Sequence, residues 1–271
     1  MSAPTAPTAP RRGGAGHRLR VLRTGRLTPH LVRVVLGGPA VADVADNGFT
    51  DRYVKLVFPR PGVTYPEPFD VAAIRGSMPP EDWPLTRTYT IRALDHAAGE
   101  MTIDFVVHGD TGLAGPWALA ARPGDELVLL GPGGAYAPPS DVDAHVLVGD
   151  EAALPAIAAA LERVTPGTPV HAFLQVDGPA DELALDSPGA LTLRWCHRDA
   201  GEDLVDAVRS ATFPGGTVAA FVHGETGAVK ALRGHLRDER GIARELLSIS
   251  GYWRRGADEE TFQAEKRADR G

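Results

Sequence analysis

The strongest constraint on the fold is a change near residue 140 in the pattern of predicted secondary structure. Before this point, short β-rich runs are bounded by Gly, Pro and Asp, which predicts a small antiparallel barrel. After it, strand-like runs alternate with helical stretches, a pattern typical of a parallel sheet covered by helices. The Pro-containing segment 137–141 is the natural linker. We therefore predict a six-stranded antiparallel β-barrel over 17–139 and a Rossmann-like parallel α/β domain over 140–271.

The expected elements follow from these patterns. Six strands are predicted in the first region, at His17–Gly25, His30–Leu36, Tyr53–Pro59, Arg87–Ala93, Met101–His108 and Glu126–Leu130, with one helix near Leu113–Arg122. In the second region we predict strands at His145–Val148, Val170–Val176, Leu191–Cys196, Thr217–Val222 and Glu245–Tyr252, and helices at Leu154–Val164, Glu202–Ser210, Ala228–Arg240 and Asp258–Arg267, the last capped by Asp258. The Pro-rich stretch 60–85 is expected to be a loop, and covering a cofactor is one hypothesis for it.

Size and composition narrow the functional classes. The 271 residues contain no run of about 18 apolar residues, so no membrane span is expected. Residues 1–16 consist of Ala-Pro-Thr repeats followed by Arg and Gly, which predicts a disordered tail. This tail lacks the apolar core of a signal peptide, so a cytoplasmic location is expected. We also expect a monomer.

Charge and cysteine content exclude further classes. With 28 Lys and Arg against 35 Asp and Glu, the chain is mildly acidic, which disfavours a nucleic-acid partner. Cys196 is the single cysteine, so there is no internal disulfide and no cysteine-ligated cluster. The histidines lack metal-ligand spacing, and no metal site is expected.

The strand at 87–92 is the first candidate for a binding site. Alternation puts Arg87 and Tyr89 on one face, roughly 6–7 Å apart. This spacing suits a guanidinium that grips a phosphate beside a ring that packs on a planar cofactor. Thr90 carries a hydroxyl for a ring nitrogen but points to the opposite face, so it reaches the same ligand only if the strand twists or ends there. An ordinary amphipathic edge strand explains the same pattern.

A second candidate follows about twenty residues later. The run from Asp104 to Gly109 is expected to pair with the first strand, and it leads into a Gly-rich turn at 110–117 that opens a helix. Free backbone N–H groups at such a turn favour an anion. A strand with Arg and Tyr followed by a phosphate-binding turn is more specific than either feature alone.

These motifs resemble the siderophore-interacting proteins, which are flavin-dependent ferric-siderophore reductases of the ferredoxin-reductase-like superfamily. The resemblance covers the chain after Gly16. It rests on five segments in the same order, at 53–56, 87–90, 104–109, 149–155 and 251–256.

The resemblance implies an FAD cofactor, with NAD(P)H as electron donor. FAD would be held by Arg87, Tyr89 and Thr90, with the backbone of 104–108 along the cofactor and the turn 111–117 at its pyrophosphate. The full set of predicted cofactor-binding residues is Arg87, Thr88, Tyr89, Thr90, Asp104, Phe105, Val106, His108, Thr111, Gly112, Ala114, Gly115, Trp117, Asp150 and Trp253.

The chain departs from the family pattern at two turns. The phosphate turn usually carries Ser and then Arg before the Trp, whereas this chain has Gly115 and Pro116, so weaker FAD retention is expected. At the first strand-to-helix turn of the second domain, Asp150 and Glu151 replace the later glycines of a dinucleotide-binding turn. Two carboxylates would repel a pyrophosphate, although acids also suit an ordinary helix N-terminus.

The substrate is expected to be a ferric siderophore, which is bulky and often anionic. Lys55, Arg254 and Lys266 are predicted to form a basic clamp for it, near the aromatic Trp253. We predict a reductase that passes electrons from NAD(P)H, or from a protein donor, to Fe(III), with no covalent or acid–base catalytic residue. A flavin reductase of broader specificity and a non-catalytic siderophore- or flavin-binding module remain as alternatives.

Overall fold

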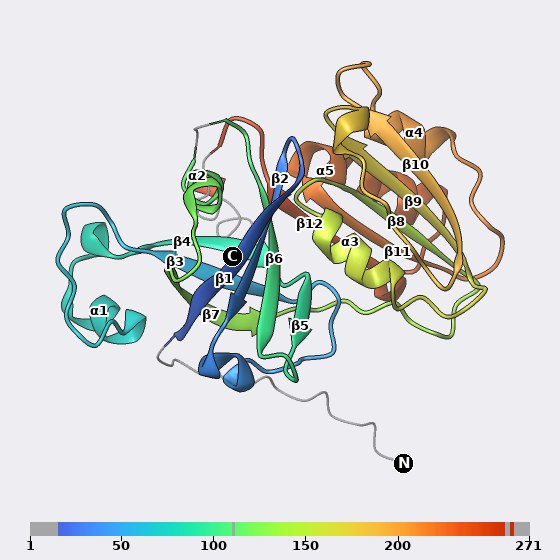
Figure 1. Cartoon of the computed structure of the whole chain (residues 1–271). Helices are drawn as coiled ribbons and strands as arrows, with labels where there is room; N and C mark the ends of the chain where they lie inside the picture. The colour runs from blue at the N-terminus through green and yellow to red at the C-terminus, as the bar shows by residue number, and fades with distance from the viewer. Residues whose placement is uncertain (1–15, 110–111, 258–260, 263–271) are drawn as a thin grey trace, which may run out of the picture.

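The structure is a computed structural model that describes residues 16–109, 112–257 and 261–262. These residues form an antiparallel and a parallel sheet that lie next to each other (Figure 1). The predicted tail, except Gly16, lies outside the described residues, and so does the predicted helix 258–267, except Thr261 and Phe262. No helix in the described part of the chain is long and apolar enough to cross a membrane.

The antiparallel sheet has seven strands in the described ranges, one more than predicted, in the order β4-β3-β7-β1-β2-β6-β5. The predicted strand Arg87–Ala93 is divided, because the backbone N–H groups of Ile91 and Arg92 bond to the carbonyls of Arg52 and Thr102 outside the ladder. This corner joins the two edge strands and curls the sheet toward a barrel. The strands are β1 His17–Thr28, β2 Leu31–Gly37, β3 Tyr53–Phe58, β4 Leu85–Thr90, β5 Ala93–Asp95, β6 Glu100–Val106 and β7 Glu126–Gly133.

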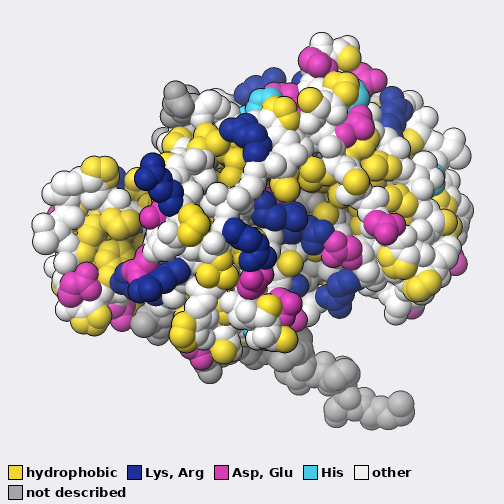
Figure 2. Space-filling view, viewed as in Figure 1, with side chains coloured by type: hydrophobic (Ala, Val, Ile, Leu, Met, Phe, Trp, Pro, Cys, Tyr) yellow, Lys and Arg dark blue, Asp and Glu magenta, His cyan; other side chains and the backbone are white. Residues whose placement is uncertain are grey.

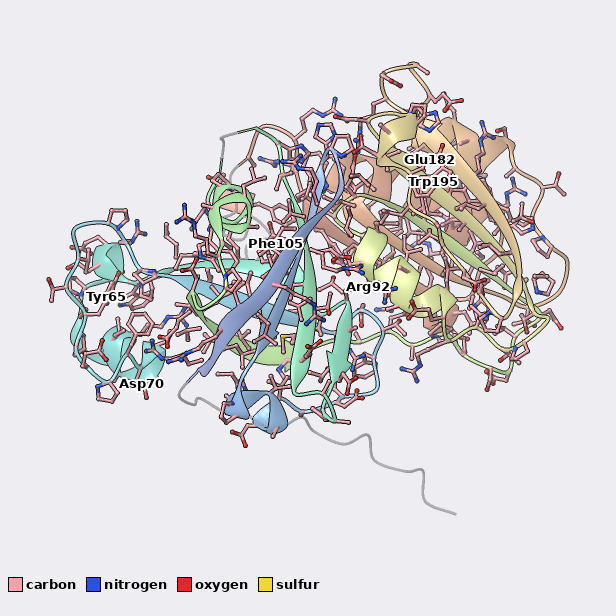
Figure 3. All side chains as sticks on the ribbon, viewed as in Figure 1. Tyr65, Asp70, Arg92, Phe105, Glu182 and Trp195 are labelled. Atoms are coloured by element: carbon pink, nitrogen blue, oxygen red, sulfur yellow. The ribbon has the colours of Figure 1, made fainter. Side chains whose placement is uncertain are left out.

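The barrel interior is filled by apolar side chains from alternate strand positions. Phe105 is fully buried there and packs against Tyr89 and Trp117, with ring centroids 4.6 and 5.5 Å apart (Figure 3). Burial of a side chain of this size stabilises the fold by about 1.5–3 kcal/mol. Helix α2 (Ala114–Ala120) covers this core with Ala114 and Ala118.

The segment between β3 and β4 contains a helix that the sequence analysis did not predict. Helix α1 (Val71–Ser77) begins after Asp70, whose Oδ1 accepts the backbone N–H groups of Ala72 and Ala73 at 2.7 and 3.1 Å. The segment projects from the barrel on the side away from the parallel sheet (Figure 1), where Tyr65 and Asp70 are marked in Figure 3.

The second sheet is parallel, with strand order β10-β9-β8-β11-β12. The chain runs from β8 outward to β10 and then returns to the other side of β8, so β8 and β11 flank the point where the strand order reverses. In open α/β sheets, ligands bind beyond the carboxyl ends of strands at this point. The strands are β8 Ala144–Asp150, β9 Pro169–Val176, β10 Ala190–His197, β11 Val218–Glu225 and β12 Leu247–Trp253.

Helices cover both faces of the parallel sheet. Every residue of α3 (Leu154–Leu161) is buried, because it packs between this sheet and Leu31 of the barrel. Helices α4 (Leu204–Ser210) and α5 (Thr226–Gly234) pack with Val146 and Phe173 on the other face. The predicted fold class, a β-barrel followed by a parallel α/β domain, is confirmed.

Polar contacts join the two sheets at several places. The side chain of Arg92, marked in Figure 3, pairs with Glu162, which caps the C-terminus of α3. Arg163 donates to the Gly48 carbonyl at 2.6 Å. At another place, the backbone N–H and Nδ1 of His30 meet the carboxylate of Asp181 at 3.1 and 2.9 Å. Basic and acidic side chains are interspersed on the face shown in Figure 2. The barrel and the parallel sheet are therefore tied to each other beyond the linker.

Candidate functional site

A cavity of about 980 Å³ is lined by residues from both sheets. This volume lies at the upper end of the range for small-molecule and cofactor sites, about 300–1,000 Å³. We call one side the barrel wall, formed by Asp51, Tyr53, Lys55, Arg87–Thr90, Asp104, Val106, His108, Gly112–Gly115, Gly134 and Ala135. The other side, the parallel-sheet wall, is formed by Glu151, Ala152, Pro155, Asp177, Arg198, His223, Ser248–Trp253 and Arg255.

Strand β4 brings all four residues of the predicted cofactor motif to the cavity. It is an edge strand, and its pairing with β3 places Arg87 opposite Leu56 and Thr88 opposite Lys55. Both faces of the strand reach the cavity because the edge itself borders it and the strand ends at Thr90. The alternation that separated Thr90 from Arg87 and Tyr89 therefore does not keep them from one ligand.

The phosphate turn forms the end of the barrel wall. Gly112, Leu113, Ala114 and Gly115 line the cavity, whereas Thr111 lies outside the described residues. A Cβ on Gly115 would lie 3.2 Å from the Val106 carbonyl oxygen. Glycine at this position thus lets the start of α2 approach the end of β6 closely.

Three other predicted cofactor residues, Phe105, Trp117 and Asp104, have side chains that contact other parts of the barrel. Phe105 and Trp117 do not line the cavity but support Tyr89 from the barrel core. Asp104 borders the cavity, yet its two carboxylate oxygens accept from Arg33 at 2.7 and 2.8 Å. These three residues contribute support and packing, while Val106 and His108 line the cavity directly.

The two carboxylates at the end of β8 have different surroundings: Glu151 lines the cavity, whereas Asp150, which was predicted to bind the cofactor, does not. Glu151 is paired through both oxygens with Arg198, which also donates to Asp177 at 2.8 Å. Asp150 is turned inward, and it accepts the backbone N–H of Glu225 and Nε1 of Trp253, each at 2.8 Å. The expected repulsion of a pyrophosphate by two facing carboxylates is therefore largely offset by their partners.

The buried carboxylate of Asp150 and the guanidinium of Arg198 both have shifted pKa values. Desolvation, followed by the nearby charge of Glu151, raises the pKa of Asp150 to about 6. The pKa of Arg198 is raised as well: desolvation lowers it, but the hydrogen bonds to Glu151 and Asp177 and the charges of Glu151 and Asp150 outweigh that effect. Arg198 therefore stays charged, and the parallel-sheet wall contains a compensated cluster of charges.

The predicted substrate residues are only partly brought together. Lys55 lines the cavity, and Trp253 lines the opposite side. Arg254 does not line it, whereas its neighbour Arg255 does, because successive residues at a strand end point in different directions. Lys266 lies outside the described residues. No described residue between 59 and 84 lines the cavity, so the hypothesis that this segment covers a cofactor finds no support.

Sequence reasoning missed several residues of the cavity. Arg198 follows β10 and His223 lies in β11, so no local motif connects them with the strand at 87–90. The carboxyl ends of parallel strands gather at one edge of a sheet, and this rule could have pointed to residues near the ends of β10 and β11. His223 stacks on Phe221 with ring centroids 3.9 Å apart and meets Ser248 Oγ at 3.0 Å.

Comparison with known proteins decides the family. The model of the siderophore-interacting FAD-binding domain matches residues 20–136, and the model of the siderophore-interacting protein matches residues 142–256. The chain belongs to the siderophore-interacting protein family. The predicted resemblance is thus confirmed.

Named relatives and a solved structure of this family cover most of the chain. Ferric vibriobactin reductase ViuB of Vibrio cholerae is 38% identical over 192 residues, covering 69% of this chain and 71% of that protein. The NADPH-dependent ferric-chelate reductase of Escherichia coli is 31% identical and covers 87% of this chain and 91% of that protein. The crystal structure of the siderophore-interacting protein SipS from Aeromonas hydrophila is 31% identical, with a TM-score of 0.80 over 95% of this chain and 99% of that chain.

The residues present fit the FAD that this family's first domain is described as binding. The edge strand offers a guanidinium and an aromatic ring, and the cavity has the size for a cofactor. Gly115 also lines the cavity, and its lack of a side chain lets the turn pack closely against the Val106 carbonyl.

Proposed function

We propose that this chain is an FAD-dependent reductase that transfers electrons from NAD(P)H, or from a protein donor, to a ferric siderophore in the cytoplasm. The observation that carries the proposal is the cavity in which Arg87 and Tyr89 on β4 face a wall that includes Trp253. The activities named for ViuB and for the Escherichia coli ferric-chelate reductase support the same reaction class.

The chain's own residues divide the work of holding the cofactor. Arg87 binds the pyrophosphate as a charge-assisted donor, and the backbone of 112–115 supplies further N–H groups. Tyr89 packs against the ring system, held in place by Phe105 at 4.6 Å between ring centroids. Thr88 and Thr90 supply hydroxyls from the face of the strand opposite Arg87 and Tyr89.

Bound FAD supplies a carrier that accepts two electrons and passes them on singly. Trp253 excludes water from one side of the cavity, and Lys55 with Arg255 attracts an anionic chelate to its mouth. Fe(II) leaves because siderophore oxygens hold the softer, less charged ion poorly. No side chain needs to form a bond with the substrate or to move a proton at it.

Absorbance spectroscopy tests this proposal. We expect the purified protein to bind FAD, to lose its yellow colour on anaerobic addition of NADPH or of a reduced ferredoxin, and to regain it with a ferric tricatecholate. Trapping the released iron with a ferrous chelator gives the second readout. A protein that cannot be reconstituted with FAD, or whose reduced flavin is not reoxidised by the ferric chelate, contradicts the proposal.

A further inference from the structure

The carboxylate of Asp150 lies where the carboxyl ends of β8, β11 and β12 meet. It is almost fully buried, with 3% of its surface exposed. Its Oδ1 accepts the backbone N–H of Ala152 at 3.0 Å, and its Oδ2 accepts both the backbone N–H of Glu225 and Nε1 of Trp253 at 2.8 Å. One side chain therefore connects the turn after β8 with the ends of two other strands.

The backbone opposite Asp150 is adapted to this carboxylate. Gly224 has a φ of 132°, and a Cβ on it would lie 2.6 Å from Oδ2 of Asp150. Any other residue would collide with the carboxylate in a conformation that L side chains rarely adopt. The chain thus leaves a space at Gly224 that the carboxylate fills.

An ionised group in this position is unfavourable by itself. Burial destabilises the charged form of Asp150, and Glu151 on the same turn adds a like charge. The other charged groups at this junction have their own partners: Glu151 pairs with Arg198, and Glu225 caps α5 through Ala228 at 3.1 Å. Asp150 is also not needed as a helix cap, because α3 begins after Ala153 without a hydrogen bond from a capping side chain.

The backbone of Trp253 is already fixed by other contacts. Its carbonyl accepts the Thr226 hydroxyl at 2.8 Å, and two residues later the N–H of Arg255 donates to Glu225 at 3.3 Å. These bonds set the path of the chain but leave the rotation of the indole open. The bond from Nε1 to Asp150 fixes that rotation.

We propose that Asp150 is a positioning residue that holds the indole of Trp253 in the orientation that forms the parallel-sheet wall. The consequence for catalysis, a fixed indole beside the flavin, rests on the function proposed above. The orientation itself is a property of the protein without cofactor and is tested there.

Indole N–H signals in ¹⁵N NMR spectra of the cofactor-free protein provide the test. The sequence has four tryptophans, and Trp253→Phe assigns the signal of interest. We expect the Trp253 signal to be shifted downfield relative to Trp83, whose Nε1 donates to the uncharged Met78 carbonyl at 2.9 Å. In Asp150→Asn, this shift should be lost and hydrogen exchange should be roughly 10-fold faster, as expected for loss of a bond to a charged acceptor.

Glu225→Gln is the matched control, because it removes a carboxylate of the same junction that does not touch the indole. Its Trp253 signal should stay in place. If Asp150→Asn does not fold, the proposal is still tested by comparing the indole N–H signals and exchange rates of Trp253 and Trp83 in the wild-type protein. A Trp253 proton that exchanges as fast as a solvent-exposed indole, or a signal that Asp150→Asn leaves unmoved, overturns the proposal.

Kinetics of the flavin-loaded protein separate this proposal from the proposed function. If Asp150 acts through the indole, Asp150→Asn and Trp253→Phe should lower kcat by the same factor, and the double variant should lower it no further. If the double variant instead lowers kcat by the product of the two single factors, Asp150 does not act through the indole and the positioning role is overturned. A protein without reductase activity would contradict the proposed function and leave the NMR result standing.

Discussion

The barrel wall and the parallel-sheet wall of the cavity are built in different ways. The motif of the barrel wall is four consecutive residues on one edge strand, Arg87–Thr90, which all reach the cavity. The parallel-sheet wall combines the run Ser248–Trp253 of β12 with single residues at the ends of other strands. Its charged groups bind one another: Arg198 holds both Glu151 and Asp177.

This difference indicates a division of tasks. The four motif residues of the barrel wall lie along one strand edge beside the cavity, whereas the charged groups Arg198, Glu151 and Asp177 of the parallel-sheet wall bind one another and connect strand ends. Substitutions on the parallel-sheet wall should therefore change stability first. Substitutions on the barrel wall should change cofactor binding first.

The largest effect is expected for Arg198→Ala. Glu151 has 3% of its surface exposed and would be left as a buried, unpaired charge, so the free energy of unfolding should fall by about 3–5 kcal/mol. Urea denaturation followed by circular dichroism measures this change. The double variant Arg198→Met with Glu151→Gln should recover most of the loss. A loss below about 1 kcal/mol for the single variant would show that the ion pair is not structural.

Asp150, which holds Trp253 of the parallel-sheet wall from behind, makes the free energy of unfolding depend on pH. Its pKa in the folded protein is about 6, above the ordinary value of 3.8. Its contribution to stability is therefore fully present below pH 4 and is lost as the pH rises through 6. Between pH 4 and pH 7, wild type should lose up to about 3 kcal/mol relative to Asp150→Asn. Parallel denaturation curves across this range check the prediction, and a constant difference between the two proteins contradicts it.

Arg87→Ala tests the barrel wall. Loss of a charge-assisted hydrogen bond of about 1.5–3 kcal/mol corresponds to FAD binding that is roughly 10- to 100-fold weaker. Isothermal titration calorimetry with FAD measures it. Arg75→Ala is a suitable control, because Arg75 stacks on Trp83 and does not line the cavity. Unchanged FAD affinity in Arg87→Ala, with unchanged stability, removes the basis for the division of tasks.

The smallest effect concerns the predicted basic clamp. Lys55 lines the cavity and Arg254 does not, so only Lys55→Ala should raise the KM for a ferric tricatecholate, by about 2- to 5-fold for one exposed charge. The effect should shrink as salt is added, because screening weakens interactions between exposed charges. If Arg254→Ala has the larger effect, the substrate approaches from a different side.

Much of the barrel wall could be predicted because its signals are local. Alternation placed Arg87 and Tyr89 on one face, and the glycines at 112 and 115 marked the turn. The roles of Phe105 and Trp117 could not be read in this way, because a lining side chain and a supporting one share the same residue types. Segment 60–85 was predicted to be a loop because α1 is a single short helix within Pro-rich sequence.

The parallel-sheet wall was harder to predict because its contacts are not local. Asp150 and Trp253 are 103 positions apart, and Arg198 and Glu151 are 47 apart. From the sequence alone, Asp150 and Glu151 could be two exposed carboxylates. They could equally be one buried carboxylate that accepts several hydrogen bonds beside one that forms an ion pair. Only the partners that the sheet brings close distinguish the two.

The sequence by itself determined the two-domain order, the edge-strand motif and the resemblance to the family, because each depends on periodicity or on neighbouring residues. The tertiary structure decided which of the predicted residues meet at one cavity and which charges are already paired there. Parallel strands deliver their carboxyl ends to one edge regardless of their separation along the chain. The state of a buried carboxylate such as Asp150 depends on the donors gathered at that edge, and these come from the far end of the chain.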